Sequence, residues 1–313
     1  MSPDAGPDTG QDASPGGDAA PGPDAAPVGG WADEFDQPMD LLSGNASAWS
    51  LLGDPASAVH DSPRLTTADI DTTRPGWLVL IPQDGHHYAW YQDDWGPLLY
   101  RTVTGNFAVV TRLRVVCEAQ TPDADCRPAP GFNAGGFVFR DPAGTENGDE
   151  NWVMYNMGGQ GPGGYAREIK KTVDSTSSLF LNPQADVTEY LLGCRVGSAF
   201  YFFYWDDIDG DWREEQFHND STLHGTPIST QIGGAGFGPV ISAFSDPGPG
   251  NSTAMWFDHA AMPQTLQVGL VSHNWDDNVL QDTRSEFDFV RFGDRAPTSR
   301  AECLDAFPGL GAN

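Results

Sequence analysis

Ala-Phe-Tyr-Phe-Phe-Tyr-Trp-Asp-Asp-Ile-Asp-Gly-Asp-Trp-Arg-Glu-Glu-Gln-Phe, residues 199–217, is the stretch of the chain that best indicates its fold. Aromatic residues favour strands, and Asp and Gly favour turns, so this stretch predicts a β-hairpin. Alternation places Phe200 and Phe202 on one face of the first strand, and Tyr201 and Phe203 on the other. Neither face is polar. We expect a strand that is covered on both sides, or one that has a core face and a face offering rings to a ligand.

The rest of the chain repeats this pattern of short strands separated by turn residues. It has 313 residues with 37 Gly and 25 Pro, and the stretch 107–116 alternates cleanly in the manner of a strand. A helical period of apolar residues is not sustained beyond about two turns. About 13–15 such runs predict an all-β, two-sheet sandwich or a barrel with almost no helix.

The charge of the chain excludes some classes of partner. It carries 44 acidic and 16 basic residues, for a net charge of −28. Such a surface repels a phosphate backbone, so nucleic acid is not an expected partner. An apolar run long enough to cross a bilayer as a helix, about 18 residues, is absent from the sequence, so we expect no transmembrane segment. Met1 is followed at once by Ser-Pro-Asp, which is not a signal peptide.

Residues 1–30 differ in composition from the rest. They consist mainly of Pro, Asp, Ala and Gly, which cannot bury a core, so we expect a disordered segment. Tracts of this kind resemble the tether that follows the lipidated cysteine of bacterial surface lipoproteins. This resemblance implies a location outside the cell or on its outer surface, and a plain flexible tail is the alternative. We expect one folded domain over residues 31–295, a C-terminal tail over 296–313, and a monomer.

Four cysteines are present, and none forms a CxxC pair. Cys117 ends a predicted strand, and Cys126 lies across a loop rich in Pro and Asp. Cys194 precedes the aromatic strand, and Cys303 lies in the tail. An even number of cysteines in an exported protein favours disulfides, so we predict Cys117–Cys126 and Cys194–Cys303, with four buried thiols as the alternative.

Several stretches are similar to the concanavalin A-like lectin/glucanase superfamily. They are Trp-Ala-Asp-Glu-Phe-Asp at 31–36, the strand pair at 96–115, Ala-Gly-Gly-Phe-Val-Phe-Arg at 134–140, the hairpin at 203–212, and the closing strands at 266–270 and 287–292. The pattern is most similar to the bacterial regulation-of-enolase-like subgroup, and related modules are appended to glycoside hydrolases. The resemblance implies an antiparallel jelly roll with one convex and one concave sheet, and often glycan binding on the concave face.

The resemblance also implies a structural Ca²⁺ between the first and last strands. Asp36 and Asp288 are its first candidate ligands, with Asp33 in reserve. The alternating carboxylates of residues 206–211 are interpreted as a hairpin turn first and a cation site second, because the bidentate Glu of an EF-hand loop is missing.

A sugar-binding face is the leading functional hypothesis. Pyranose rings stack on exposed aromatic faces, while polar side chains bind the hydroxyl groups. For each tryptophan, core packing is the alternative. The candidate residues are His87, Trp90, Trp95, Arg140, Trp152, Tyr155, Arg167, Trp205 and Trp275.

Hydrolysis is the rival hypothesis, and it needs two carboxylates facing each other across a groove. Glu286 and Asp288 share one face of the last strand by alternation. The laminarinase-type members of the superfamily, however, use a longer Glu-x-Asp-x-x-Glu motif in mid-chain, whereas position 291 here is Arg. Glu214 and Glu215 are expected to be solvated. We therefore predict non-catalytic recognition of a neutral or weakly basic polysaccharide outside the cell, with a glycoside hydrolase-like enzyme and an interaction domain without a glycan ligand as alternatives.

Overall fold

The computed structural model describes most of the chain from residue 30 onward. The described residues are 30–43, 47–52, 64–84, 89–92, 96–118, 125–145, 147–161, 164–184, 186–218, 230–232, 252–254, 256–275, 282–308 and 310. Residues 1–29, which include nearly all of the predicted disordered segment, lie outside this part of the chain.

One sheet has ten strands. Its main path runs in the order β14 (Asp211–Glu214), β13 (Ala199–Asp206), β12 (Thr188–Val196), β7 (Phe107–Val116), β20 (Arg284–Phe292), β5 (Leu78–Pro82), β4 (Leu65–Ile70) and β2 (Met39–Asp40). In addition, β1 (Ala32–Asp33) pairs with β20, and β18 (Trp256–Asp258) pairs with β13. The first strand of the domain, β1, and its last strand, β20, therefore lie side by side.

The second sheet has eight strands, in the order β16 (Thr230–Ile232), β11 (Thr176–Pro183), β10 (Gly164–Val173), β9 (Trp152–Gln160), β8 (Asn133–Arg140), β19 (Thr265–His273), β6 (Leu99–Thr104) and β3 (Ser50–Leu51). The short strands β15 (Gln216–His218) and β17 (Ser252–Ala254) form a separate pair. The short 3₁₀ helix η1 (Leu41–Ser43) and helix α1 (Arg300–Asp305) complete the elements of the described residues.

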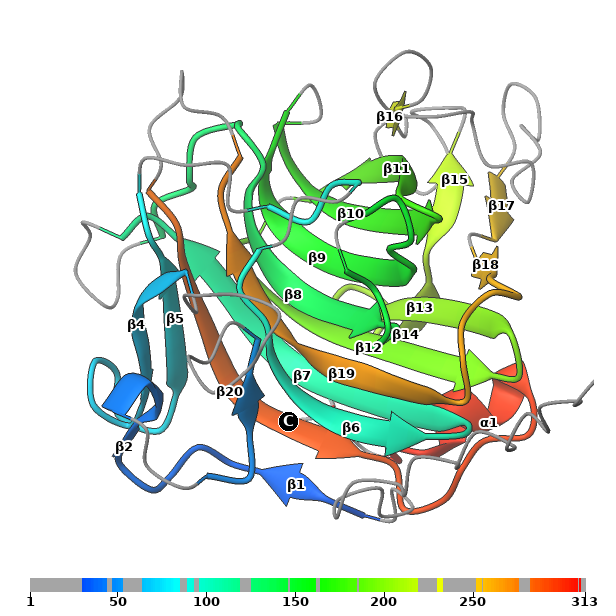
Figure 1. The fold of residues 1–313 in the computed structure, drawn as a ribbon, viewed down its shortest axis with the longest axis horizontal. Coiled ribbons are helices and arrows are strands. Elements are labelled where there is room, and N and C mark those ends of the chain that lie inside the picture. Colours follow the sequence, from blue (N-terminus) through cyan, green and yellow to red (C-terminus); the bar gives the residue numbers. More distant parts are fainter. Residues whose placement is uncertain are drawn as a thin grey trace, which may run out of the picture.

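The main hydrophobic core lies between the two sheets. In β9, Val153, Tyr155 and Met157 belong to this core, whereas Trp152 and Met154 pack in a separate cluster on the opposite face of the strand. This follows from the two-residue period of a strand. Figure 1 shows the long, curved strands of the two sheets stacked on one another. The predicted two-sheet antiparallel β-sandwich is confirmed, since every recorded strand pair is antiparallel.

The hairpin predicted at residues 199–217 is present as β13 and β14, with Trp205 opposite Trp212. The Asp206 carboxylate accepts a hydrogen bond from the Ile208 amide, and Gly210 supplies the left-handed turn residue. The turn interpretation of the 206–211 carboxylates is thus supported.

The aromatic strand β13 is covered on both sides, which is the first of the two alternatives that its sequence left open. Phe200 and Phe202 are buried in the core between the sheets. Phe203 packs on the other face of the sheet, in a cluster with Cys303 and Phe307 of the C-terminal segment. The rings of β13 are therefore used mainly for packing.

The expectation that Glu214 and Glu215 are solvated is wrong. Glu214 is buried against the guanidinium of Arg300. Glu215 is buried between the sheets, where it pairs with Arg167 and accepts hydrogen bonds from Tyr155 and from Asn182. Adjacent carboxylates on a strand do point to opposite faces, but here each face meets a partner from a distant segment.

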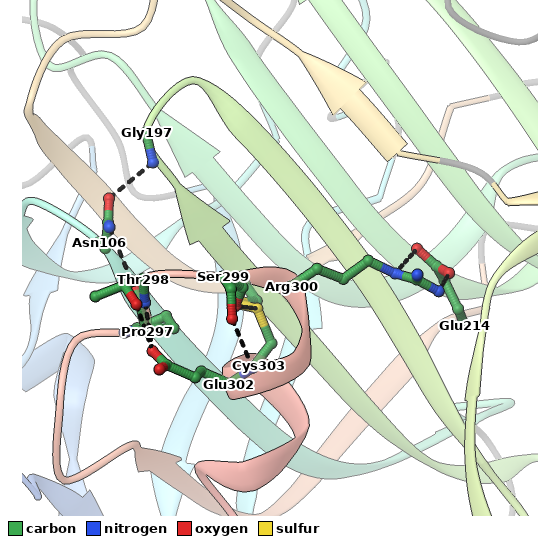
Figure 2. Close-up of a disulfide and its surroundings, with 10 residues drawn as sticks. Asn106, Gly197, Glu214, Pro297, Thr298, Ser299, Arg300, Glu302 and Cys303 are labelled. Carbon is green, nitrogen blue, oxygen red and sulfur yellow. Dashed lines mark hydrogen bonds and ion pairs between the residues drawn. A yellow bond between two sulfur atoms is a disulfide. The ribbon is translucent and has the colours of Figure 1, made fainter.

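The structure contains both predicted disulfides, Cys117–Cys126 and Cys194–Cys303. The second one joins β12 to α1, and Figure 2 shows the hydrogen bonds and the ion pair around it. Asn106 donates a hydrogen bond to the Pro297 carbonyl and accepts one from the Gly197 amide, so it ties two connections to the tail. The C-terminal segment is thus fixed to the ten-stranded sheet, as the sequence predicted. Within the described residues, we find no helix that is long and apolar enough to cross a membrane.

Candidate functional site

The eight-stranded sheet has an outer face, which we define as the side turned away from the other sheet. Five strands contribute alternate side chains to it, and these side chains are buried under further segments of the chain. Its apolar part includes Trp90, Val138, Trp152, Met154 and Val271. Its polar part is a cluster formed by Asn156 and Gln160 of β9, Glu168 and Lys170 of β10, and His273 of β19.

Strand register explains how this polar cluster assembles. In β10, the sequence Glu168-Ile-Lys170 places Ile169 in the main core and turns the two charged residues to the outer face. Glu168 is paired with Asn156 of β9, and Lys170 with Leu179 of β11. Two charged groups are therefore held next to apolar side chains and amides.

Three members of the cluster form a chain of hydrogen bonds. Gln160 Nε2 donates to Asn156 Oδ1 at 2.8 Å, and Asn156 Nδ2 lies 2.9 Å from His273 Nε2. Because Asn156 Nδ2 can only donate, His273 Nε2 accepts, and its ring carries the proton on Nδ1. Burial, with a smaller contribution from Lys170, lowers the pKa of His273 to about 3. The ring is therefore neutral near pH 7.

Lys170 and Glu168 form an ion pair at the centre of the cluster. The Nζ to Oε1 distance is 2.8 Å, and Nζ donates to the Trp90 carbonyl at 2.9 Å. Both side chains are almost completely buried. Neither carboxylate oxygen of Glu168 has a hydrogen-bond partner among the described residues, although the side chain is fully buried and Oε1 lies 2.8 Å from Lys170 Nζ. Buried carboxylate oxygens without a donor are costly, which marks this ion pair as incompletely satisfied by hydrogen bonds.

A cavity of about 270 Å³ opens beside this ion pair. Lys170 lines this cavity, and the other lining residues are Ala89, Tyr91, Phe132, Leu179 and Trp275. Tyr91 and Trp275 pack edge to face, with ring centroids 5.1 Å apart. The cavity thus combines aromatic walls with a single cationic group among its described lining residues.

Backbone conformation also marks this region. Phe132 has a φ of 55° and Gln92, next to Tyr91, has a φ of 49°. Non-glycine residues seldom adopt this left-handed region, and such residues concentrate at functional sites. The backbone therefore holds two segments of the cavity wall in uncommon conformations.

Among the predicted sugar-binding residues that the structure describes, Trp275 alone lines this cavity. Trp90 and Trp152 lie on the same outer face but are fully buried and pack against each other, with centroids 5.7 Å apart. The expectation that they are exposed stacking rings is corrected, because covering segments seal this part of the sheet. His87 and Trp95 lie outside the described residues.

Arg140 is on the outer face of the eight-stranded sheet, yet it is only 1% exposed. Its guanidinium binds both carboxylate oxygens of Glu150, at 2.7 and 3.0 Å, and also donates to Gln267 and to the Gly144 carbonyl. Arg140 is therefore part of a buried structural network, and the prediction that it contacts a ligand is corrected.

Three other predicted binding residues do not reach the cavity. Tyr155 and Arg167 point to the inner side of the sheet and meet Glu215, with the Arg167 guanidinium 3.6 Å from the Tyr204 ring centroid. Trp205 belongs to the ten-stranded sheet, where it packs edge-on against Trp212. The predicted set is thus divided between the two sides of one sheet and a second sheet.

The carboxylates of the rival enzyme hypothesis are also separated. Glu286 is buried and bonded to Arg74, Arg114 and Arg284, and the strand register shifts just after it. Asp288 instead pairs with Arg112 in a half-exposed position. Both belong to β20 of the ten-stranded sheet, so they are not a pair of carboxylates at the cavity.

Two of the three predicted calcium ligands, Asp33 and Asp288, have other partners. Asp33 accepts hydrogen bonds from the Phe35 amide and from Trp49 Nε1. Within the described ranges, no group of three or more His, Cys, Asp or Glu side chains is arranged to hold a metal ion. A calcium site involving Asp36 and Asp288 stays a prediction.

Sequence reasoning missed most of the cavity. Phe132 is a single aromatic residue in a connection, where nothing in the pattern distinguishes it. Tyr91 directly follows Trp90 in an aromatic-rich stretch, from which Trp90 and not Tyr91 was selected. Glu168 and Lys170 did carry a signal, because two opposite charges stand at alternate positions of an otherwise well-formed strand, and lysine occurs only at 170 and 171. Burying such charges costs desolvation free energy, and buried charges are usually paired or functional.

The chain is similar to several solved structures. A protein-family model that matches the chain was not found, and neither was a similar curated protein. Similar solved structures include xylan β-1,4-xylosidase from Bacillus halodurans (TM-score 0.47, 16% identity, 83% of this chain, 38% of that chain). Two more are lectin I from Ulex europaeus (0.43, 9%, 84% and 97%) and β-glucanase from Bacillus licheniformis (0.39, 8%, 84% and 97%).

This chain spans 38% of the length of the xylosidase chain that it matches. Because all three TM-scores are below 0.5, we take no ligand or activity from these proteins.

The neutral state of His273 leads to a prediction about acid stability. The pKa is about 3 in the folded protein and 6.5 in the unfolded one. Below pH 6.5 the unfolded state therefore binds a proton that the folded state does not, and stability falls as the pH falls toward 3. We expect His273→Gln to remove up to about 1.4 kcal/mol of this loss per pH unit.

Urea unfolding at intervals between pH 7.5 and 4 measures this effect. The contribution of His273 is the pH dependence of the free energy of unfolding of the wild type minus that of the variant. Any constant destabilisation that the substitution adds at neutral pH cancels in this difference. Parallel stability curves for the two proteins would contradict the prediction.

Proposed function

We propose that this protein binds a polysaccharide or other glycan, without cleaving it, at the cavity beside Lys170 and Glu168. The observation that carries the proposal is the cavity itself, in which aromatic side chains stand next to a buried ion pair with an unpartnered carboxylate oxygen. Sugar rings present apolar C–H faces and polar hydroxyl edges, and this site offers a counterpart to each.

The dimensions support one sugar unit as the anchored part of the ligand. The volume of about 270 Å³ is just below the usual range for ligand pockets, about 300–1,000 Å³. The crossed rings of Tyr91 and Trp275 give the cavity an aromatic wall. Trp275 is only partly buried, so part of its ring is accessible.

Two features favour binding over hydrolysis. Glycoside hydrolysis uses two carboxylates, about 5–5.5 Å apart for retention or about 6.5–9.5 Å apart for inversion. Among the described residues that line the cavity, no carboxylate is present. Glu168, which lies behind the wall, is already engaged by Lys170.

The proposed setting is outside the cell or on its outer surface, with the protein acting as a monomer. Two disulfides support it, because disulfides persist in oxidising compartments. The Pro/Asp/Ala/Gly-rich composition of residues 1–30 is suited to a tether.

Trp275→Ala is expected to weaken glycan binding by about 1–3 kcal/mol, because an aromatic anchor would be lost from the cavity. A glycan array identifies the ligand, and titration calorimetry with that ligand measures the loss. Trp256→Ala is the matched control, since Trp256 is partly exposed on the other sheet and should leave the affinity unchanged.

Reducing-sugar release measured on the same glycans distinguishes the alternatives. Binding without release supports the proposal, whereas release by the purified protein refutes it in favour of an enzyme. A protein that neither binds nor cleaves any glycan on the array would be an interaction domain, and the proposal would be abandoned. Equal losses in Trp275→Ala and Trp256→Ala would show that the cavity is not the site.

A further inference from the structure

We propose that the Lys170–Glu168 ion pair makes the site selective for uncharged sugars over acidic ones. This inference rests on the proposed function and adds to it the chemical class of the ligand. It concerns the charge that a bound sugar meets, which follows from the contacts of these two side chains.

The Lys170 ammonium has three N–H donors. One donates to the Trp90 carbonyl at 2.9 Å, and Glu168 Oε1 lies 2.8 Å from Nζ as an ion pair without hydrogen-bond geometry. The side chain lines the cavity, so a remaining donor can be directed to an oxygen of the ligand. A hydroxyl group is sufficient to accept it.

The ion pair with Glu168 also neutralises the positive charge of Lys170, which would otherwise attract an acidic sugar. Lys170 is the single cationic residue among the described residues that line the cavity. Its charge is balanced by Glu168, whose carboxylate is completely buried directly behind it. A uronate would lose its hydration on entry and meet a site of zero net charge, which is unfavourable for an anion.

The other charged groups and the histidine that the structure describes on the outer face do not change this balance. His273 is neutral because burial and Lys170 lower its pKa to about 3. The Arg140 guanidinium is matched by the Glu150 carboxylate in a bidentate contact. The positive charges of Lys170 and Arg140 therefore cancel the negative charges of Glu168 and Glu150, and His273 adds no charge.

Glu168→Gln tests the inference because it keeps the shape of the side chain and removes its charge. The variant leaves the Lys170 charge unbalanced at the cavity wall. The probes are matched pairs on a glycan array, such as polygalacturonate and its fully methyl-esterified form, which share one backbone and differ in the charge and the methyl group of each carboxyl. We expect the wild type to favour the uncharged member, and the variant to shift the acidic-to-neutral affinity ratio at least about tenfold toward the acidic one.

Two controls keep the result specific. Glu34→Gln changes the net charge of the protein equally, but Glu34 pairs with Arg291 at an exposed position on the other sheet, so the ratio should stay as in the wild type. Glu168→Gln combined with Lys170→Met removes both charges, and it should retain the preference for neutral sugars even if affinity falls.

The outcomes separate this inference from the proposed function. Stronger binding of acidic members by the wild type overturns the inference alone, and this measurement does not depend on any variant folding. An unchanged ratio in folded Glu168→Gln, or the same shift in Glu34→Gln, also overturns it. If the wild type binds no glycan, the proposed function and the inference fall together.

Discussion

Arg140→Leu should lower the free energy of unfolding by about 3–5 kcal/mol, the range observed when one member of a buried ion pair is removed. Glu150 is completely buried, and the Arg140 guanidinium binds both of its carboxylate oxygens. The substitution would leave that carboxylate buried without its counter-charge, and would also leave the side-chain oxygen of Gln267 without its donor.

Urea unfolding at pH 7 measures the loss, and two variants serve as controls. Arg140→Leu combined with Glu150→Leu removes both charges and should recover much of the stability, since replacing a whole buried pair is often neutral. Arg291→Leu breaks an exposed pair with Glu34 and should cost less than about 1 kcal/mol. A single-variant loss as small as that of Arg291→Leu would show that Arg140 is not structural, and would reopen its role as a ligand contact.

Loss of the Cys194–Cys303 disulfide is the second large effect that we expect. The two cysteines are 109 positions apart, and closing a loop of about 100 residues restricts the unfolded chain by about 4.7 kcal/mol on the chain-entropy estimate. Cys117 and Cys126 are only 9 positions apart, which corresponds to about 2.7 kcal/mol by the same relation.

Paired alanine variants test this order by urea unfolding. The Arg300–Glu214 ion pair and the Asn106 contacts to the tail do not involve sulfur, so α1 has other attachments when the disulfide is absent (Figure 2). The native structure should therefore persist, and circular dichroism checks that it does. A smaller loss for the Cys194/Cys303 variant than for the Cys117/Cys126 variant would contradict the prediction.

The fold could be predicted to a large extent because its determinants are local. Alternation of side chains along a strand is a property of the backbone, so Phe107 to Val116, or Phe200 to Phe203, indicates both a strand and its two faces. Asp and Gly between two such runs indicate a turn. The cysteine pairing followed from where each cysteine lies relative to strands and tail.

The candidate site could not be predicted in the same way. Aromatic residues were selected because sugars stack on rings, but the sequence does not state which rings other segments cover. Trp90 and Trp152 are sealed beneath the covering segments of the outer face, whereas Trp275 lines the cavity. Exposure depends on those covering segments, which have no periodic pattern.

The sequence by itself thus determined the strands, the alternation of their two faces and the hairpin at 199–217, because these depend on neighbours along the chain. The pairing of Cys194 with Cys303, which are 109 positions apart, is a tertiary contact that the sequence predicted from the place of each cysteine. Tertiary structure decided that Lys170 lies beside Phe132 and Tyr91, and that Arg140 is matched by Glu150. Sheet register and the packing of connections bring these residues together from distant positions. A binding site depends on contacts across the sheet, and those contacts exist only once the whole sandwich has formed.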